Sequence, residues 1–246
     1  PVVHFSLNEV RNQTMDVGQA KIVTFDVLEN SDLNVVVEYI LSLKKKVLWV
    51  GSAGMANALV KTMRVQYPVL ALVGSISETS RMQVRVAQEA GAKVVEMNIA
   101  ELLRGGDIQK AAREAIELLH YGQDVVVVTA REHEDYLEAV KVGKEKGMSR
   151  TAVAKYAQSR IGELSALILK EAKVCGCFLT GGDTAISVNN YNHAHGAKLV
   201  EEVLPIIALI QLDGGDYPGL PCIVKGGSIG DREALAKSIV YFKERM

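Results

Sequence analysis

Two glycine-rich stretches near the C-terminal end of the chain are the most informative features for predicting its fold. Thr180-Gly181-Gly182-Asp183-Thr184 follows the apolar run Cys175–Leu179, and Lys225-Gly226-Gly227-Ser228-Ile229-Gly230 follows Leu220–Val224. Each pattern is typical of a short buried strand that turns directly into a helix. Backbone N–H groups are free at the start of a helix, and glycine lets a ligand approach them closely. Together the two turns predict a phosphate site built from two loops.

Strand and helix patterns alternate along the rest of the chain. Continuous apolar runs predict strands that are buried on both faces, and helices between them favour parallel pairing. We therefore expect an α/β protein, a three-layer α/β/α architecture with a mostly parallel or mixed sheet. Strands are expected at 1–7, 21–27, 47–50, 68–73, 93–97, 124–129, 175–179, 198–203 and 221–224. Helices are expected at 31–43, 55–65, 78–90, 109–120, 151–172 and 232–243, and the charged segment 130–147 is expected to be a loop with some helix.

The composition limits the classes of function. The chain has 246 residues, 48% of them hydrophobic, which is enough for one large domain or two small ones. A net charge of −1 gives no broad basic surface for nucleic acid. Three cysteines favour a reducing compartment without disulfides. No apolar run reaches membrane-spanning length and no signal peptide is visible, so the cytoplasm is the expected location.

Several common motifs are missing. Neither the Walker pattern G-x-x-x-x-G-K-[ST] nor G-x-G-x-x-G occurs, which argues against a P-loop NTPase and against a Rossmann oxidoreductase that uses NAD. The pair His193 and His195 has no evident third ligand, so residues 192–195 are expected to be a polar surface turn. No protein-built metal centre is predicted.

Each polar residue in these turns has two possible roles. Asp183 is either the N-cap of the following helix or a group that holds Mg²⁺ or orients an attacking hydroxyl. The hydroxyls of Ser75, Ser77, Thr184 and Ser228 either bind phosphate oxygens or cap helices. Lys225 either neutralises a phosphate or is a solvated lysine at a strand end.

Four motifs in order resemble the four-carbon acid sugar kinases. Residues 47–54 resemble the end of that family's substrate-binding domain, and Gly74-Ser75-Ile76-Ser77 with Thr79 and Gln83 is similar to the segment that opens its nucleotide-binding domain. Residues 181–184 match the family's Gly-Gly-Asp-Thr, and residues 225–230 resemble its Lys-x-Gly-x-Phe-Gly, with Ile229 in place of Phe.

The resemblance implies an ATP-dependent kinase that phosphorylates a hydroxyl of a small sugar acid such as threonate, erythronate or 3-oxo-tetronate, with Mg²⁺ beside the phosphates. It implies that residues 1–66 are the last part of the substrate-binding domain and residues 67–246 the nucleotide-binding domain. The boundary is expected at Tyr67-Pro68, because Pro68 opens a new strand after a polar helix end. It implies Asp183 as the catalytic residue and nucleotide contacts at Ser75, Ser77, Gly181, Gly182, Asp183, Thr184, Gly226, Gly227 and Gly230.

One departure leaves an alternative open. The family's Asp-Asp-x-Thr-Gly-Ala substrate motif does not occur in these 246 residues. The alternative function is therefore a non-catalytic module that binds a nucleotide or another anion. A homodimer is expected in either case, and the sugar acid, the attacked hydroxyl and the catalytic base are left open.

Overall fold

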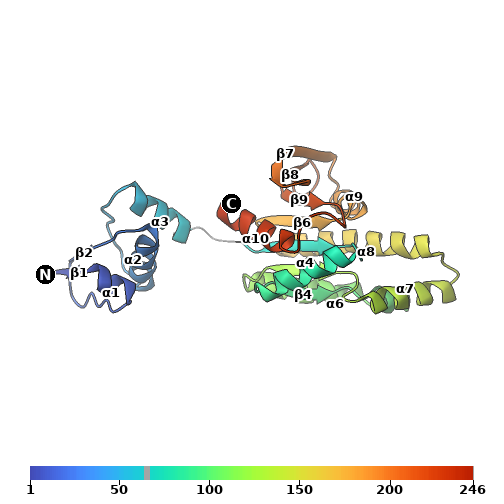
Figure 1. Cartoon of the computed structure of the whole chain (residues 1–246), viewed down its shortest axis with the longest axis horizontal. Helices are drawn as coiled ribbons and strands as arrows, with labels where there is room; N and C mark the ends of the chain where they lie inside the picture. The colour runs from blue at the N-terminus through green and yellow to red at the C-terminus, as the bar shows by residue number, and fades with distance from the viewer. Residues whose placement is uncertain (64–66, 246) are drawn as a thin grey trace. The chain divides into compact units, whose positions relative to one another are not determined.

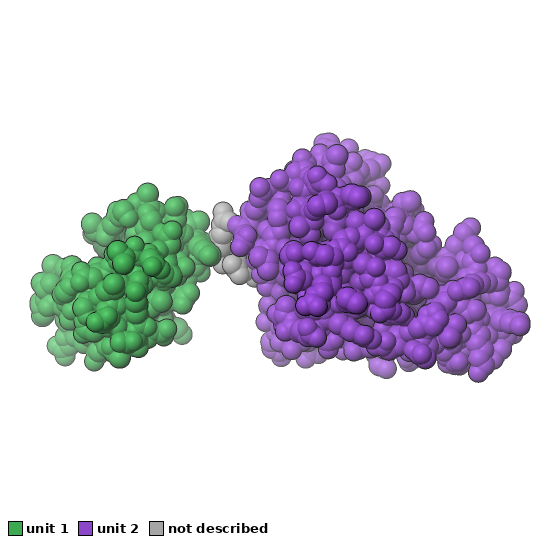
Figure 2. Space-filling view, in the orientation of Figure 1, with its two compact units in different colours: residues 1–65 green, residues 66–246 purple. Residues whose placement is uncertain are grey.

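The computed structural model describes residues 1–63 and 67–245, and the chain divides into two compact units, residues 1–65 and 66–246 (Figure 2). Each unit has its own hydrophobic core. Residues 64–66, where the expected helix over 55–65 ends beside the expected boundary, lie outside the described residues. No described helix is both long enough and apolar enough to cross a membrane.

Unit 1 is a small α/β layer. Strands β1 (Val2–Phe5) and β2 (Ile22–Phe25) pair in parallel, and helices α1 (Leu7–Arg11), α2 (Asn30–Ser42) and α3 (Ala53–Met63) belong to the same unit. Asp32 is buried at the start of α2, where the Arg11 guanidinium donates to it at 2.8 Å. That bond, together with backbone N–H donors, holds the pKa of Asp32 well below its ordinary value.

The strand expected at residues 47–50 does not form. The segment has no regular secondary structure, and Leu48 and Val50 are 89% and 85% exposed. Among the described residues of unit 1 the sheet contains β1 and β2 alone, so this apolar segment has no strand with which to pair. Its Trp49 packs against the core of the unit instead.

Unit 2 is built on a seven-stranded sheet of the order β4-β5-β3-β6-β9-β8-β7. Figure 1 shows β7, β8 and β9 close together at one edge of this unit. Five neighbouring strands are parallel: β4 (Lys93–Glu96), β5 (Val125–Val128), β3 (Val69–Val73), β6 (Gly176–Thr180) and β9 (Pro221–Lys225). The hairpin of β7 (Gly196–Leu204) and β8 (Ile207–Asp213) adds an antiparallel edge. Every residue of β3, β5 and β6 is buried, as their continuous apolar sequences predict.

Helices cover both faces of this sheet, which confirms the expected three-layer α/β/α fold. On one face, α4 (Glu78–Glu89) and α10 (Ala234–Arg245) pack on Ala71, Val126 and Phe178. The other face is covered by α5 (Ile99–Leu103), α6 (Ile108–His120), α7 (His133–Glu145), α8 (Arg150–Glu171) and α9 (Gly182–Tyr191).

In unit 2, α7 and β8 differ from the expectation. The segment 130–147 is mostly helix α7, because Glu132 and Asp135 form a capping box and Ala139 and Val142 are buried. Strand β8 was not expected at all, and a turn with Ile206 at a φ of +62° connects it to β7.

Candidate functional site

A cavity of about 320 Å³ opens at the carboxyl edge of the sheet in unit 2. It lies beyond the ends of β3, β5, β6 and β9, which contribute Gly74, Thr129, Thr180 and Gly227 to its wall. The chain leaves β3 toward β4 on one side of the sheet and leaves β6 toward the hairpin on the other side. Ligands of open α/β sheets bind at such a divergence, so the topology marks this cavity as the candidate site.

The start of α9 forms one end of the cavity. Gly181 is the N-cap residue with a φ of +99°, and among the described residues no side chain caps this helix. A Cβ built on Gly182 would meet no atom within 4 Å, so the backbone is open there to a ligand. Uncapped N–H groups and the positive end of the helix dipole favour a phosphate at this point.

Asp183 does not act as a cap. It lies in the first turn of α9, one residue after Gly182, and it is exposed on the wall of the cavity. Its Oδ2 accepts a hydrogen bond of 2.9 Å from the Gln158 Nε2 of α8. The N-cap reading is therefore wrong, and the carboxylate is held so that it faces the site.

The two glycine turns interlock with the turn after β3. Ser77 is the N-cap of α4, accepting from the Ser80 N–H, and its hydroxyl donates to the Gly227 carbonyl at 2.8 Å. A Cβ on Gly227 would stand 2.5 Å from the Ser75 Oγ, so a side chain at this position would displace that serine. Ser77 therefore holds the turn from behind, whereas Ser75 and Gly227 line the cavity.

Lys225 and Gln83 fix the second glycine turn. Lys225 is buried rather than solvated, which corrects one of its two readings, and its Nζ donates to the Gly226 and Gly227 carbonyls at 2.8 and 3.0 Å. Burial lowers the pKa of Lys225 to about 8. Gln83 is also buried and donates through Nε2 to the Ile229 and Asp231 carbonyls.

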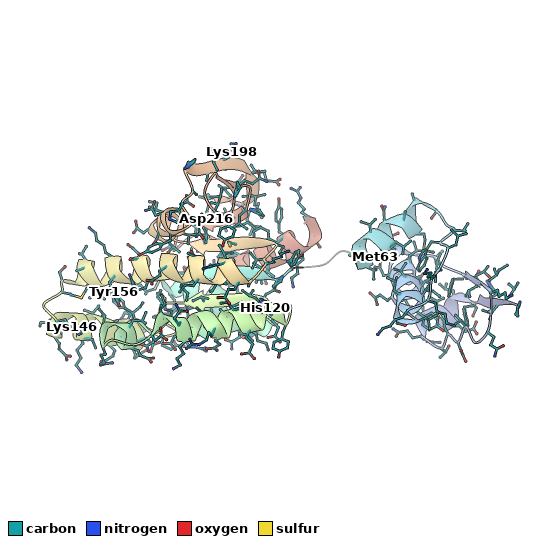
Figure 3. The ribbon with its side chains drawn as sticks, turned by 180° about the vertical axis from the view of Figure 1, so that it is seen from behind. Met63, His120, Lys146, Tyr156, Lys198 and Asp216 are labelled. Carbon is teal, nitrogen blue, oxygen red and sulfur yellow. The ribbon has the colours of Figure 1, made fainter. Side chains whose placement is uncertain are left out.

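The other end of the cavity is apolar. Helices α5, α7 and α8 contribute Ile99, Tyr136, Ala139, Val153, Ala154 and Ala157 to it. Figure 3 shows α7 and α8 as a helical hairpin, with Lys146 at its turn. Gly143 of α7 allows close packing, because a Cβ there would stand 2.2 Å from the Val153 Cγ2. Small and aromatic side chains of this kind suit a flat heterocycle.

Six of the nine residues expected to contact a nucleotide line the cavity, and three do not. Those that line it are Ser75, Gly181, Gly182, Asp183, Thr184 and Gly227. Ser77, Gly226 and Gly230 lie in the supporting turns, with Gly230 at a φ of +85°. Tyr136 and Ala139 were missed because α7 was expected to be mainly loop, and the α8 residues were missed because the sequence does not show that this helix faces the cavity. Gln158 was missed because the sequence shows no pairing with Asp183.

Sequence comparisons match both units. The family described as a nucleotide-binding C-terminal domain matches residues 70–235, and the family described as a sugar-binding N-terminal domain matches residues 3–59. A D-threonate kinase of Salmonella typhimurium is 30% identical over 231 residues, covering 91% of this chain and 55% of that protein. A D-erythronate kinase of Heliobacterium modesticaldum is 25% identical over 180 residues, covering 70% of this chain and 41% of that protein. The chain thus spans about half the length of the curated relatives it matches.

Solved structures give a matching result. A domain of unknown function from Bordetella bronchiseptica, crystallised with citrate as a domain-swapped dimer, is 26% identical and superposes with a TM-score of 0.65 over 99% of this chain and 59% of that one. A Haemophilus influenzae protein with 15% identity has a TM-score of 0.57 over 98% of this chain and 60% of its own, which supports the fold alone.

Proposed function

The chain belongs to the four-carbon acid sugar kinase family, and on that premise we propose that it is the nucleotide-binding part, with a segment of the sugar-binding part, of an ATP-dependent kinase. Its substrate is a four-carbon sugar acid such as threonate, erythronate or 3-oxo-tetronate, which receives the phosphoryl group on a hydroxyl. The observation that carries this proposal is one cavity with an uncapped helix start at one end and an apolar slot at the other.

The shape of the cavity supports one orientation of ATP. The phosphates lie against the first turn of α9 and the open backbone of Gly182, with Ser75 and Gly227 beside them. The adenine lies in the slot between α7 and α8, against Tyr136 and Ala157. The remaining predicted contacts at Ser77, Gly226 and Gly230 act by holding the turns.

The residues present fit a magnesium ion bound together with the nucleotide. Mg²⁺ is usually held by one or two carboxylates together with substrate phosphates and water. Asp183 supplies one carboxylate beside the expected phosphates, and no cluster of three or more His, Cys, Asp or Glu side chains occurs among the described residues. When bound, the ion would neutralise charge on the phosphates.

Catalysis in this site is mainly positioning and charge stabilisation. Phosphoryl transfer needs an in-line attack by the substrate hydroxyl and stabilisation of the charge on the transferring group. The N–H groups at the start of α9 supply fixed dipoles, and we assign Asp183 as the catalytic carboxylate. The sugar-binding match over residues 3–59 supports 1–66 as substrate-domain sequence and 67–246 as the nucleotide domain.

Calorimetric titration tests the nucleotide half of the proposal directly. The chain is titrated with ATP and Mg²⁺, and with NAD as the control. Saturable ATP binding without NAD binding is the expected result, and binding of neither nucleotide would contradict the proposal. Transfer of phosphate to D-threonate or D-erythronate then separates a kinase from the alternative, a module that binds ATP without catalysis.

We further propose a cytoplasmic homodimer. A Bordetella bronchiseptica relative crystallised as a domain-swapped dimer, which supports self-association in this family. Light scattering on the purified chain distinguishes a dimer from a monomer by mass.

A further inference from the structure

Lys225 combines burial, a charge and contact with both glycine turns. Its side chain is in the last residue of β9 and is 4% exposed. Its backbone carbonyl accepts from the Gly181 N–H at 2.9 Å, and Gly181 is the N-cap of α9. Its Nζ donates to the Gly226 and Gly227 carbonyls. One residue thus ties the turn after β6 to the turn after β9.

Among residues 1–63 and 67–245, no carboxylate forms an ion pair with the Lys225 ammonium, and its hydrogen-bond partners are the neutral carbonyl oxygens of Gly226 and Gly227. Burying an ammonium group without an opposite charge is costly, and burial alone accounts for its lowered pKa. A buried cation that lacks an opposite charge and lies behind a candidate phosphate site is best explained by a bound anion that balances its charge.

The charged side chains around this end of β9 are already engaged. On α4, Glu78 pairs with Arg81, and Lys237 of α10 pairs with Asp231 and Glu233, which precede that helix. Asp183 of α9 accepts from Gln158. Thr180 of β6, which is in register with Lys225, carries no charge, and neither does Ala208 of β8, which is in register with Val224.

We propose that Lys225 is the positioning residue for the nucleotide phosphates: it fixes both glycine turns and places a buried positive charge behind them, without touching the nucleotide. The proposal rests on the proposed function, since it needs a phosphate in this cavity. Gly227 carries the effect, because its carbonyl accepts from Lys225, Ser77 and Ser80 while its Cα faces Ser75 in the cavity wall. The binding energy of the phosphates therefore depends on the protonation of a residue outside the cavity.

Two ligands and three proteins test this role. The dissociation constants of Mg-ATP and of adenosine are measured for the wild type, Lys225→Met and Ser80→Ala as the pH rises from below 8 to well above it. Ser80→Ala is the matched control, because it removes a neutral donor to the same Gly227 carbonyl. Wild-type affinity for Mg-ATP is expected to fall above pH 8, and Lys225→Met is expected to bind Mg-ATP about tenfold more weakly with a flat pH profile. Adenosine affinity is expected to be equal in all three proteins.

The outcomes separate the two proposals. If the wild type binds neither ligand, the proposed function fails. If the wild type binds Mg-ATP with an affinity that is constant across this pH range, or if Lys225→Met loses ATP and adenosine equally, the charge has no role and this inference is overturned. If Lys225→Met does not fold, the pH profile of Ser80→Ala provides the test. This variant is expected to lose affinity for Mg-ATP above pH 8 as the wild type does, and an affinity that is constant with pH would overturn the inference.

Discussion

Gly74 and Thr184 approach each other so closely that a Cβ on Gly74 would stand 2.2 Å from the Thr184 Oγ1. Gly74 follows β3 and Thr184 lies in the first turn of α9, so this contact joins the turn after β3 to the start of α9. Thr184 is buried and has little room to move. The position of α9 over the sheet therefore depends on the absence of a side chain at residue 74.

Replacing this glycine tests the contact. Gly74→Ala is expected to lower the free energy of unfolding by about 1–3 kcal/mol, because the added methyl group overpacks the site. Gly196→Ala is the control, since a Cβ there meets no atom within 4 Å. Urea denaturation measures both variants. The double variant Gly74→Ala, Thr184→Ala should recover most of the loss, and a double variant as unstable as Gly74→Ala would show that Thr184 is not the cause.

Asp183 is expected to matter for ligand binding and not for stability. Asp183 does not cap α9, so Asp183→Ala should lower the free energy of unfolding by much less than the loss of a cap does. The same variant should weaken Mg-ATP binding. Asp107 serves as the control, because its side chain does cap a helix: it accepts from the Gln109 N–H at the start of α6. Asp107→Ala should therefore lower the free energy of unfolding by about 1 kcal/mol and leave ATP binding unchanged. Calorimetry and thermal unfolding of the two variants give both readouts. Equal loss of stability in both would restore the cap reading.

The buried parallel strands could be predicted because their apolar character is visible in the local sequence. The run Val125–Val128 and the apolar residues of β3 and β6 have no polar alternation, and this pattern admits only strands that are covered on both faces. The turn at Gly181 and Gly182 was likewise predictable, since glycine after a buried strand favours an abrupt start of a helix. Six expected site residues line the cavity for that reason.

The parts that could not be predicted depend on distant partners. Gly143 of α7 packs closely on Val153 of α8 at the apolar end of the cavity, and nothing in the charged sequence of α7 indicates that contact. Ser77 looks like a phosphate ligand, yet its hydroxyl is used by the Gly227 carbonyl, 150 residues away. Residues 47–50 have the composition of a strand, but pairing needs a neighbour that the described residues of unit 1 do not offer.

Gln83 is expected to be a stability residue that also affects the site. Its amide donates to the Ile229 and Asp231 carbonyls at 3.1 and 2.7 Å from a buried position. Gln83→Met should lower the free energy of unfolding by about 1–3 kcal/mol, because it leaves two carbonyls without this donor. Gln88 lies on the exposed side of the same helix and serves as the control. Gln88→Met should lower the free energy of unfolding by less than about 0.5 kcal/mol. Denaturant unfolding compares them, and equal costs would contradict a specific role for the amide.

Filling the apolar slot should block the nucleotide base. Ala154 is an exposed residue on the cavity wall, so Ala154→Phe is expected to abolish measurable ATP binding while the fold is retained. Lys155→Phe adds the same ring at the next position of α8, outside the cavity wall, and should bind ATP like the wild type. Titration with ATP checks both. Undiminished ATP binding by Ala154→Phe would place the base elsewhere.

Lys225 should make the stability of the fold rise with pH. Burial lowers its pKa from 10.5 to about 8, so between these values the unfolded chain binds more protons than the folded one. The free energy of unfolding then increases as the pH rises through that window, while below it both states are protonated and the lysine is least favourable. Urea unfolding of wild type and Lys225→Met across this range isolates the contribution. The stability of the wild type relative to the variant should increase between pH 8 and 10.5. A constant difference would mean that the folded lysine titrates at its ordinary pKa, and a falling difference would mean that folding raises its pKa.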